Sequence, residues 1–471
     1  MLSPSMQLQV VVALLGIALG AMVIRHPERS AVFGFALAPY LPLYMAYSLP
    51  FASTQPLLAW WGLLIWGGAY LCLILRRIPS PGPFPMLLDV SVLAKNFQSN
   101  IVWSTLVSGF TLTQGLRNAI FLGGMWFLPA VVMGRLGRSR IWVERLFQAM
   151  VLSAVLQALL ALLEKINFNL MAFLLDHVTL LRFFLVSELE YKVYQRMDRF
   201  GMIRAQGTFH ESIDLGWYFG LVLLLMIGGW QFWGRGIPNR ARVLLVGLVA
   251  AGLLTTLSGT PFLATVVGFA VLLLLLPGVT RLRVVVVLSV LVLLGLLLAY
   301  MIPRLSDVRL VVEAFLQVEN EVYLYEGVGP NTQGRLMAYA ALWPLVMESP
   351  VWGHGNFLQR TGAVSLVRDI TSRYMIELIE GGFIGLFFFL LPVGLALAGS
   401  LHARFRSHDI WIQTLSATLV AVLAQCLVMD FVKNNGGVVE TYYWMTIGLA
   451  FTLSTHMRLQ LRSEAGSTRT W

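Results

Sequence analysis

The chain consists mainly of apolar stretches long enough to cross a lipid bilayer. A spanning helix needs about 20 predominantly apolar residues, and by that measure the sequence contains about 13 candidate spans. Backbone polar groups in lipid must be satisfied within the segment, so such stretches fold as helices. We therefore expect an all-α polytopic membrane protein of about 12-13 transmembrane helices, forming one integral membrane domain over residues 1-471. The expected spans lie near residues 6-24, 31-49, 56-75, 86-108, 112-133, 142-163, 211-233, 242-257, 261-276, 284-301, 373-398, 410-429 and 440-457.

Basic residues mark alternate connections between these spans. The short connections at 50-56, 111-115, 258-260 and 430-440 carry one lysine between them, Lys433, whereas the short connections at 25-29, 76-77, 135-140, 235-242, 281-283 and 404-406 and the tail from 458 carry arginines. Loops rich in arginine are retained in the cytoplasm. The pattern predicts a bacterial inner-membrane protein with a periplasmic amino terminus and a cytoplasmic carboxyl terminus. The first apolar stretch has no basic region before it and no small-residue cleavage site, so no cleavable signal peptide is expected.

Composition excludes a soluble fold and disfavours nucleic acid as a partner. The chain is 58% hydrophobic and 12% charged, against roughly 25% charged residues in soluble domains. The net charge is +10, but its basic residues are spread over the cytoplasmic loops, which fits orientation and anionic lipid better than nucleic acid. Both cysteines, Cys72 and Cys426, lie inside apolar segments, so neither a disulfide nor a cysteine-based metal site is expected.

Two long connections, residues 164-210 and 302-372, interrupt the succession of spans, and the threading places both on the periplasmic side. The first contains an amphipathic stretch from Leu170 to Phe200. Its helical spacing favours an interfacial helix on the outer leaflet, and the alternative is a lid that grips a lipid-linked substrate. Since these are the only sizeable polar segments, the chemistry is expected on this face.

The first candidate cluster leads from the first long connection into a span. Arg204, His210, Glu211 and Asp214 lie within about ten residues, and the two carboxylates are three residues apart, on one face of a helix. The simpler interpretation is that Glu211 caps the helix. A further arginine, Arg117, enters the fifth span and either reaches the lipid headgroups or faces an anionic ligand.

A second cluster lies in the second long connection. Arg335 follows a glycine at the start of an amphipathic helix, which ends at Ser349-Pro350 and a Gly-His-Gly turn containing His354. An arginine near a helix amino terminus suits phosphate oxygens. His354 is a candidate base or ligand, although a histidine in a turn is more often simply solvated.

The third cluster enters the eleventh predicted span from the periplasmic side. It comprises Asp369, Arg373, Tyr374, Glu377 and Glu380. Ionisable groups at the edge of a membrane bundle are expensive to hold there, which makes them functional candidates. The alternative is that Arg373 and Glu377, four residues apart, only pair with each other.

The order of these motifs resembles the superfamily of O-antigen ligases and bacterial polysaccharide polymerases. The resemblance covers roughly residues 200-395. It consists of Arg204-x-x-Gly-Thr-Phe before a span, Ser258-Gly259 between two short spans, Gly-Arg335 in a long outer loop, then Pro350, Gly353 and Gly355, and Glu380-x-Gly382 followed by Gly385.

This resemblance implies a GT-C-like membrane glycosyltransferase that acts without a nucleotide sugar, a metal or another cofactor. Family members transfer a glycan from undecaprenyl pyrophosphate to an acceptor hydroxyl at the periplasmic face. By resemblance, Arg204 and Arg335 hold the pyrophosphate and stabilise its developing charge. A general base would activate the acceptor, and Arg117, Asp214, His354, Arg373, Tyr374, Glu377 and Glu380 are candidates for binding the substrate.

The sequence departs from the ligases at two places. Where family ligases usually carry a His-Asn pair, this chain has Thr371 and Ser372, so the acting histidine is missing. Asp369, Glu211 or His210 is expected in its place, and the sequence does not choose among them. Many members also have Ser-Arg where this chain has Gly259-Thr260. Both differences favour a polymerase of exopolysaccharide or O-antigen repeat units over a ligase that transfers glycan to lipid A core.

Two further classes of protein remain as alternatives to a glycan-transferring enzyme. A transporter or flippase predicts internal inverted repeats and charges near the middle of the membrane, but no convincing repeat is present and most ionisable residues lie at the periplasmic edge. The other class is a non-catalytic scaffold for polysaccharide assembly. A polymerase would have the lipid-linked donor, the glycan acceptor and membrane lipid as partners, together with a chain-length regulator and a flippase of its pathway.

Overall fold

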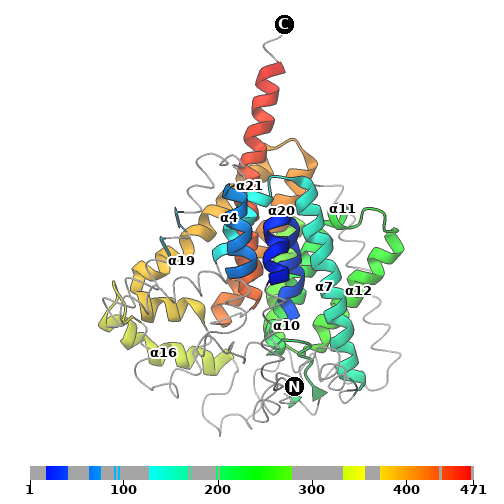
Figure 1. The fold of residues 1–471 in the computed structure, drawn as a ribbon. Helices are drawn as coiled ribbons and strands as arrows, with labels where there is room; N and C mark the ends of the chain where they lie inside the picture. Colours follow the sequence, from blue (N-terminus) through cyan, green and yellow to red (C-terminus); the bar gives the residue numbers. More distant parts are fainter. Residues whose placement is uncertain are drawn as a thin grey trace, which may run out of the picture.

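A computed structural model describes residues 17-40, 63-75, 90-91, 94-95, 127-167, 170, 198-199, 202-209, 211-277, 332-355, 372-433 and 438-467. Apart from one small ribbon, its regular structure is helical (Figure 1). The labelled elements are α2 (Pro27–Leu37), the π-helical turn η2 (Leu63–Gly67), α4 (Gly68–Leu75), α7 (Arg140–Ile166), β1 (Asp198–Arg199), β2 (Met202–Ile203), α10 (Ser212–Gly228), α11 (Trp230–Trp233), α12 (Asn239–Thr255), α13 (Gly259–Leu275), α16 (Thr332–Glu348), α19 (Arg373–Arg406), α20 (Ile410–Val432) and α21 (Val438–Ser467).

The described helices confirm an all-α membrane protein. Among them, α7, α19 and α20 are long and apolar enough to cross a bilayer, and α10 and α13 are shorter apolar helices. The expected span at 142-163 corresponds to α7, and the expected pair at 242-257 and 261-276 corresponds to α12 and α13. Several of the other expected spans lie partly or wholly outside the described residues, so their total number stays a prediction.

Two boundaries differ from the sequence expectation. The amphipathic pattern predicts a helix that continues to Phe200, but Asp198–Arg199 pairs antiparallel with Met202–Ile203 as a short ribbon. The span expected over 211-233 ends at Gly228 and resumes as the short α11. Glycine pairs weaken a helix, and Gly228-Gly229 stands at this interruption.

The core of the bundle is built around α10. Its sequence is apolar on every side, and every residue except Ile213 is buried, as expected for a helix surrounded by others. The neighbours that enclose it are α7, α12, α13 and α20. On one flank of the bundle, α19 leans outward toward α16, while α21 continues beyond the bundle toward the carboxyl terminus (Figure 1).

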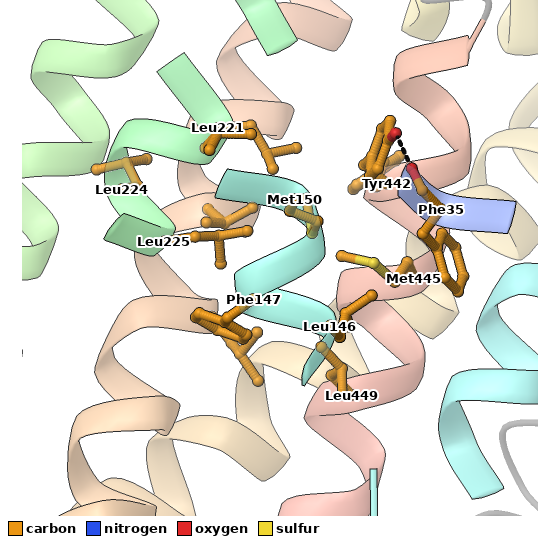
Figure 2. Close-up of a cluster of buried hydrophobic side chains, with 14 of the residues drawn as sticks. Phe35, Leu146, Phe147, Met150, Leu221, Leu224, Leu225, Tyr442, Met445 and Leu449 are labelled. Atoms are coloured by element: carbon orange, nitrogen blue, oxygen red, sulfur yellow. Dashed lines mark hydrogen bonds between the residues drawn. The ribbon is translucent and has the colours of Figure 1, made fainter. Parts of the chain in front are cut away.

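Figure 2 shows how α2, α7, α10 and α21 pack together. Tyr442 on α21 donates a hydrogen bond to the carbonyl of Phe35 on α2, with an oxygen–oxygen distance of 2.5 Å. Its hydroxyl is thus satisfied inside an apolar environment. The labelled side chains that fill this region are Phe35, Leu146, Phe147, Met150, Leu221, Leu224, Leu225, Tyr442, Met445 and Leu449.

Arginines gather at one end of the bundle. Arg140, at the start of α7, pairs with Asp409, which caps α20. Arg235 pairs with Glu144 at 2.9 Å, and Arg404 donates to the carbonyl of Leu275. These contacts involve the starts of α7 and α20, the ends of α13 and α19, and the connection between α11 and α12. The alternation of loops places all of them on one side of the membrane, which is called the basic layer below. The opposite end, where α7 and α12 finish and α10, α13 and α19 begin, is called the Arg204 end below.

Candidate active site

Arg204 anchors the connection between α12 and α13. Its Nε donates to the carbonyl of Thr256 and its Nη2 to Oγ of Ser258, both at 3.3 Å. Leu257, between these two residues, has a φ of 47°, an unusual conformation for a leucine. Two motifs that the sequence singled out separately, Arg204 and Ser258-Gly259, thus meet in space.

The backbone after Arg204 is fixed by buried side chains of α7. One carboxylate oxygen of Glu164 accepts hydrogen bonds from the amides of Gln206 and Gly207, both at 2.9 Å. Gln157 donates to the hydroxyl of Thr208 at 2.5 Å. Gly207 has a φ of 56°, which glycine adopts readily. The Gly-Thr part of the motif therefore holds Arg204 in place, and sequence reasoning missed Glu164 and Gln157.

Lys433 joins the start of α10 to the end of α20. Its ammonium pairs with Glu211 and lies 3.3 Å from a carboxylate oxygen of Asp214. Burial alone would lower the pKa of Lys433, but the two carboxylates outweigh it and raise that pKa. Glu211 occupies the N-cap position of α10 without a capping side-chain bond. The expected grouping of Glu211 with Asp214 is confirmed, and Glu211 stands at the start of the helix as the simpler interpretation expects, but its side chain binds Lys433 and makes no capping bond.

The start of α19 holds a buried cluster of charges around Glu377. One oxygen of this carboxylate accepts from Nε and Nη2 of Arg373, at 3.1 and 3.0 Å. Lys95 pairs with the other oxygen and also donates to the carbonyl of Gly385 at 3.4 Å. Arg373 further contacts Glu440 on α21 at 3.7 Å. The predicted pairing of Arg373 with Glu377 is confirmed, as part of a larger network.

Polar groups of α20 and α21 border this network. Tyr374 donates to the carbonyl of Leu427 at 2.8 Å, which ties α19 to α20. Oδ2 of Asp430 and the hydroxyl of Tyr443 are buried next to each other and have no partner in well-formed hydrogen-bond geometry among the described residues. Asp430 nevertheless interacts electrostatically with Arg373. Buried polar groups of this kind often have a functional or solvent-binding role, and no motif recognised in the sequence includes Asp430 or Tyr443.

The loop that follows α16 forms backbone hydrogen bonds with α19 at a break in that helix. Gly382 has a φ of 61° and a ψ of −161°, which interrupts the helix. The amides of His354 and Gly355 donate to the carbonyls of Ile379 and Glu380, at 2.7 and 2.9 Å, and Phe383 donates to Pro350 at 2.7 Å. Gly353, with a φ of 70°, lies against the backbone of residues 380-382. The predicted Gly353, Gly355 and Gly382 motifs therefore form one joint, which leaves no room for a side chain at Gly353 or Gly382.

The remaining predicted residues are placed only in part. Nε2 of His354 lies 2.7 Å from the carbonyl of Leu345, so this side chain is held against α16, and its role in substrate binding stays a prediction. Arg335 lies in the first turn of α16, as expected, but its side chain is not described. Arg117, His210 and Asp369 lie outside the described residues.

Charged groups from distant parts of the sequence thus meet at the Arg204 end. Arginine and lysine there are suited to phosphate oxygens, and carboxylates are suited to proton transfer. Among the described residues, no group of three or more His, Cys, Asp or Glu side chains is arranged to hold a metal ion. The expectation of metal-free catalysis stays a prediction.

Comparison with known proteins identifies one segment. Residues 243–418 match the family model of the O-antigen ligase, which confirms the resemblance to the ligase and polymerase superfamily. The match includes most of α12, then α13, α16, α19 and the first part of α20. It contains Ser258, Arg335, Arg373, Glu377 and Glu380, while Lys95, Arg204, Lys433 and Glu440 lie outside it. No curated protein matches the chain.

Proposed function

We propose, on the premise that residues 243–418 form the O-antigen ligase domain of this membrane protein, that the chain is a glycan polymerase. It joins oligosaccharide repeat units carried on undecaprenyl pyrophosphate into an exopolysaccharide or O-antigen chain. The Arg204 end faces the periplasm and the basic layer faces the cytoplasm of a bacterial inner membrane, in keeping with the retention of arginine-rich loops.

The observation that carries this proposal is the contact of Arg204 with the α12–α13 turn. Its guanidinium bonds to Thr256 and Ser258 bring a residue outside the matched domain to a motif inside it. Arg335 begins α16 in the same domain. Both arginines bind the pyrophosphate and stabilise the charge that develops when the glycosidic carbon–oxygen bond breaks.

The polymerase is favoured over a ligase by the residues at the start of α19. The family histidine is missing there, and Ser372 has a structural role: it caps α19 by accepting from the amide of Met375 at 3.5 Å. Its hydroxyl also lies 3.5 Å from the carbonyl of Asp430. Asp369, Glu211 and His210 stay the candidate bases from the sequence, and the carboxylate of Glu211 is held in an ion pair with Lys433.

The reaction takes a lipid-linked glycan donor and a glycan acceptor and needs no metal. A chain-length regulator and a flippase of the same pathway would act beside it. Direct displacement of the lipid pyrophosphate would invert the anomeric configuration.

A host strain without this protein distinguishes polymerase from ligase. Loss of a polymerase leaves single repeat units on the lipid carrier, because no longer chains are made. Loss of a ligase leaves long chains on the carrier, because they are made but not transferred. We expect single units, with long chains restored by the wild-type gene. Accumulation of carrier-linked long chains would instead assign a ligase.

A transporter is the second candidate, because α19 is broken next to buried charges, as in many transporter helices. The break at Gly382 is filled by the loop at residues 350-355, which disfavours a substrate path through it. A transporter would move the lipid-linked unit across the membrane without joining units together.

A further inference from the structure

The geometry points to Glu380 as the proton acceptor for the incoming glycan hydroxyl. This inference rests on the proposed function and supplies the base that the missing histidine leaves open. It follows from a comparison of the two glutamates at the start of α19, Glu377 and Glu380, which are three residues apart and differ in their partners.

Glu377 is already neutralised. Lys95 binds one of its carboxylate oxygens and Arg373 binds the other through two nitrogens, at 3.0 and 3.1 Å. Its side chain is only 8% exposed. Both of its carboxylate oxygens are thus occupied by cations and are not free to approach a substrate hydroxyl. Glu377 therefore serves to position Arg373 and Lys95 and is a poor base.

Glu380 lacks such a clamp. Its carboxylate takes part in no ion pair or hydrogen bond with another described residue, because Arg373 and Lys95 direct their bonds to Glu377. The residue is partly exposed, in contrast to the buried Glu377. A carboxylate that no cation binds directly, in a residue that is not fully buried, can approach a substrate at the Arg204 end and accept its proton.

The break in α19 fixes the position of Glu380. The helix is interrupted at Gly382, so Glu380 lies in the last turn of the short segment that begins at Arg373. The amides of His354 and Gly355 bond the carbonyls of Ile379 and Glu380, which holds the backbone at Glu380 in place.

The charged groups that interact directly with Glu380 are Glu377, Arg373 and Lys95. The backbone of His354, in the loop after α16, is bonded next to it. Asp430 on α20 and Glu440 on α21 belong to the same cluster through their contacts with Arg373. Four carboxylates, those of Glu377, Glu380, Asp430 and Glu440, thus interact with this one arginine.

The reaction step balances without a further reagent. The acceptor hydroxyl oxygen forms a bond to the anomeric carbon of the donor glycan while its proton passes to the carboxylate of Glu380. The bond between that carbon and the pyrophosphate oxygen breaks, and the electron pair leaves with the lipid pyrophosphate. Glu380 then releases the proton to water, which restores the carboxylate.

The test compares Glu380→Gln with the wild type in a transfer assay that uses undecaprenyl-pyrophosphate-linked repeat units and purified protein in detergent. Loss of a general base is expected to reduce kcat about 10²- to 10⁴-fold, while binding of the donor, measured separately, is unchanged. Glu380→Asp should recover part of the rate. The matched control is Glu348→Gln, at the exposed carboxyl end of α16, which should behave as the wild type.

The dependence of kcat on pH separates a base from a structural residue. The wild-type rate should rise with pH as the base loses its proton, and Glu380→Gln should lose this acidic limb. A Glu380→Gln variant with wild-type kcat and an unchanged pH profile would overturn the assignment of Glu380 and leave the polymerase intact. A variant that no longer binds donor would overturn it too, in favour of a binding role. If the wild type joins no units, the proposed function itself fails.

Discussion

Replacing Gly382 by alanine is expected to destabilise the protein by about 4 kcal/mol or more and to prevent most of it from folding. The combination of φ and ψ at Gly382 is essentially restricted to glycine, and a residue forced into such a region costs about 1-3 kcal/mol. A Cβ at this position would also collide with the backbone carbonyl of Val351. Backbone atoms cannot turn aside as a flexible side chain can, so the loop would leave the break in α19.

The measurement is thermal unfolding in detergent, together with the yield of monodisperse protein. Gly394→Ala is the matched control, because Gly394 lies in the same helix and a Cβ added there would have no other atom within 4 Å. At that position, alanine should stabilise the helix by up to about 1 kcal/mol. Equal stability of the two variants would contradict the role of the joint between α16 and α19.

The second large effect is expected at Arg204. Arg204→Ala should lower the transfer rate by about 10²- to 10³-fold, as removal of a group that stabilises developing charge does. The substitution also removes the hydrogen bonds to Thr256 and Ser258. The turn is then held less firmly, which should lower the transfer rate further. The protein should still insert into the membrane, because the core around α10 is unaffected.

Two further variants separate charge from position. Arg204→Lys keeps the positive charge but loses the planar fork that reaches two acceptors, and its rate should fall between those of the wild type and the alanine variant. Ser258→Ala removes one hydrogen bond and keeps the arginine, so we expect a loss of less than about tenfold. A wild-type transfer rate in Arg204→Ala would rule out the proposed role of the arginine.

Features that depend on local spacing could be predicted from the sequence. The spans of α7, α12, α13 and α20 follow from runs of apolar residues, and the Arg373–Glu377 pair follows from a separation of four residues on a helix. Arg204 and Ser258 are recognisable in the sequence only as two separate motifs of a resembling family, and their contact was not predicted. Local periodicity could not have placed these two residues together.

Contacts between distant segments could not be predicted. Lys95 and Glu377 are 282 positions apart, and Lys433 is 222 positions from Glu211. The only signal for either lysine was a charge within or beside an apolar stretch, which identifies a residue that needs a partner but not the partner itself. Glu211 illustrates the consequence, since a local rule favours capping whereas the folded chain offers it a buried lysine.

The glycines of the α16–α19 joint show a second limit on what the sequence alone can predict. Gly353, Gly355 and Gly382 are recognisable in the sequence as motif positions, but the reason for them is not. In the structure all three have positive φ values, and Gly353 and Gly382 each lie against the backbone of the other segment. The glycine motif is thus required because two backbones approach each other closely. The glycines have a structural role, and the charged side chains around them are the candidates for the chemistry.

The most direct test of the proposed polymerase is to incubate the purified protein in detergent with undecaprenyl-pyrophosphate-linked repeat units from its host, without metal, and to resolve the products by length. We predict a ladder of chains that differ by one repeat unit and that is lost in Arg335→Ala. Donor that remains unchanged in the presence of the wild-type protein, whether bound or free, would contradict a polymerase.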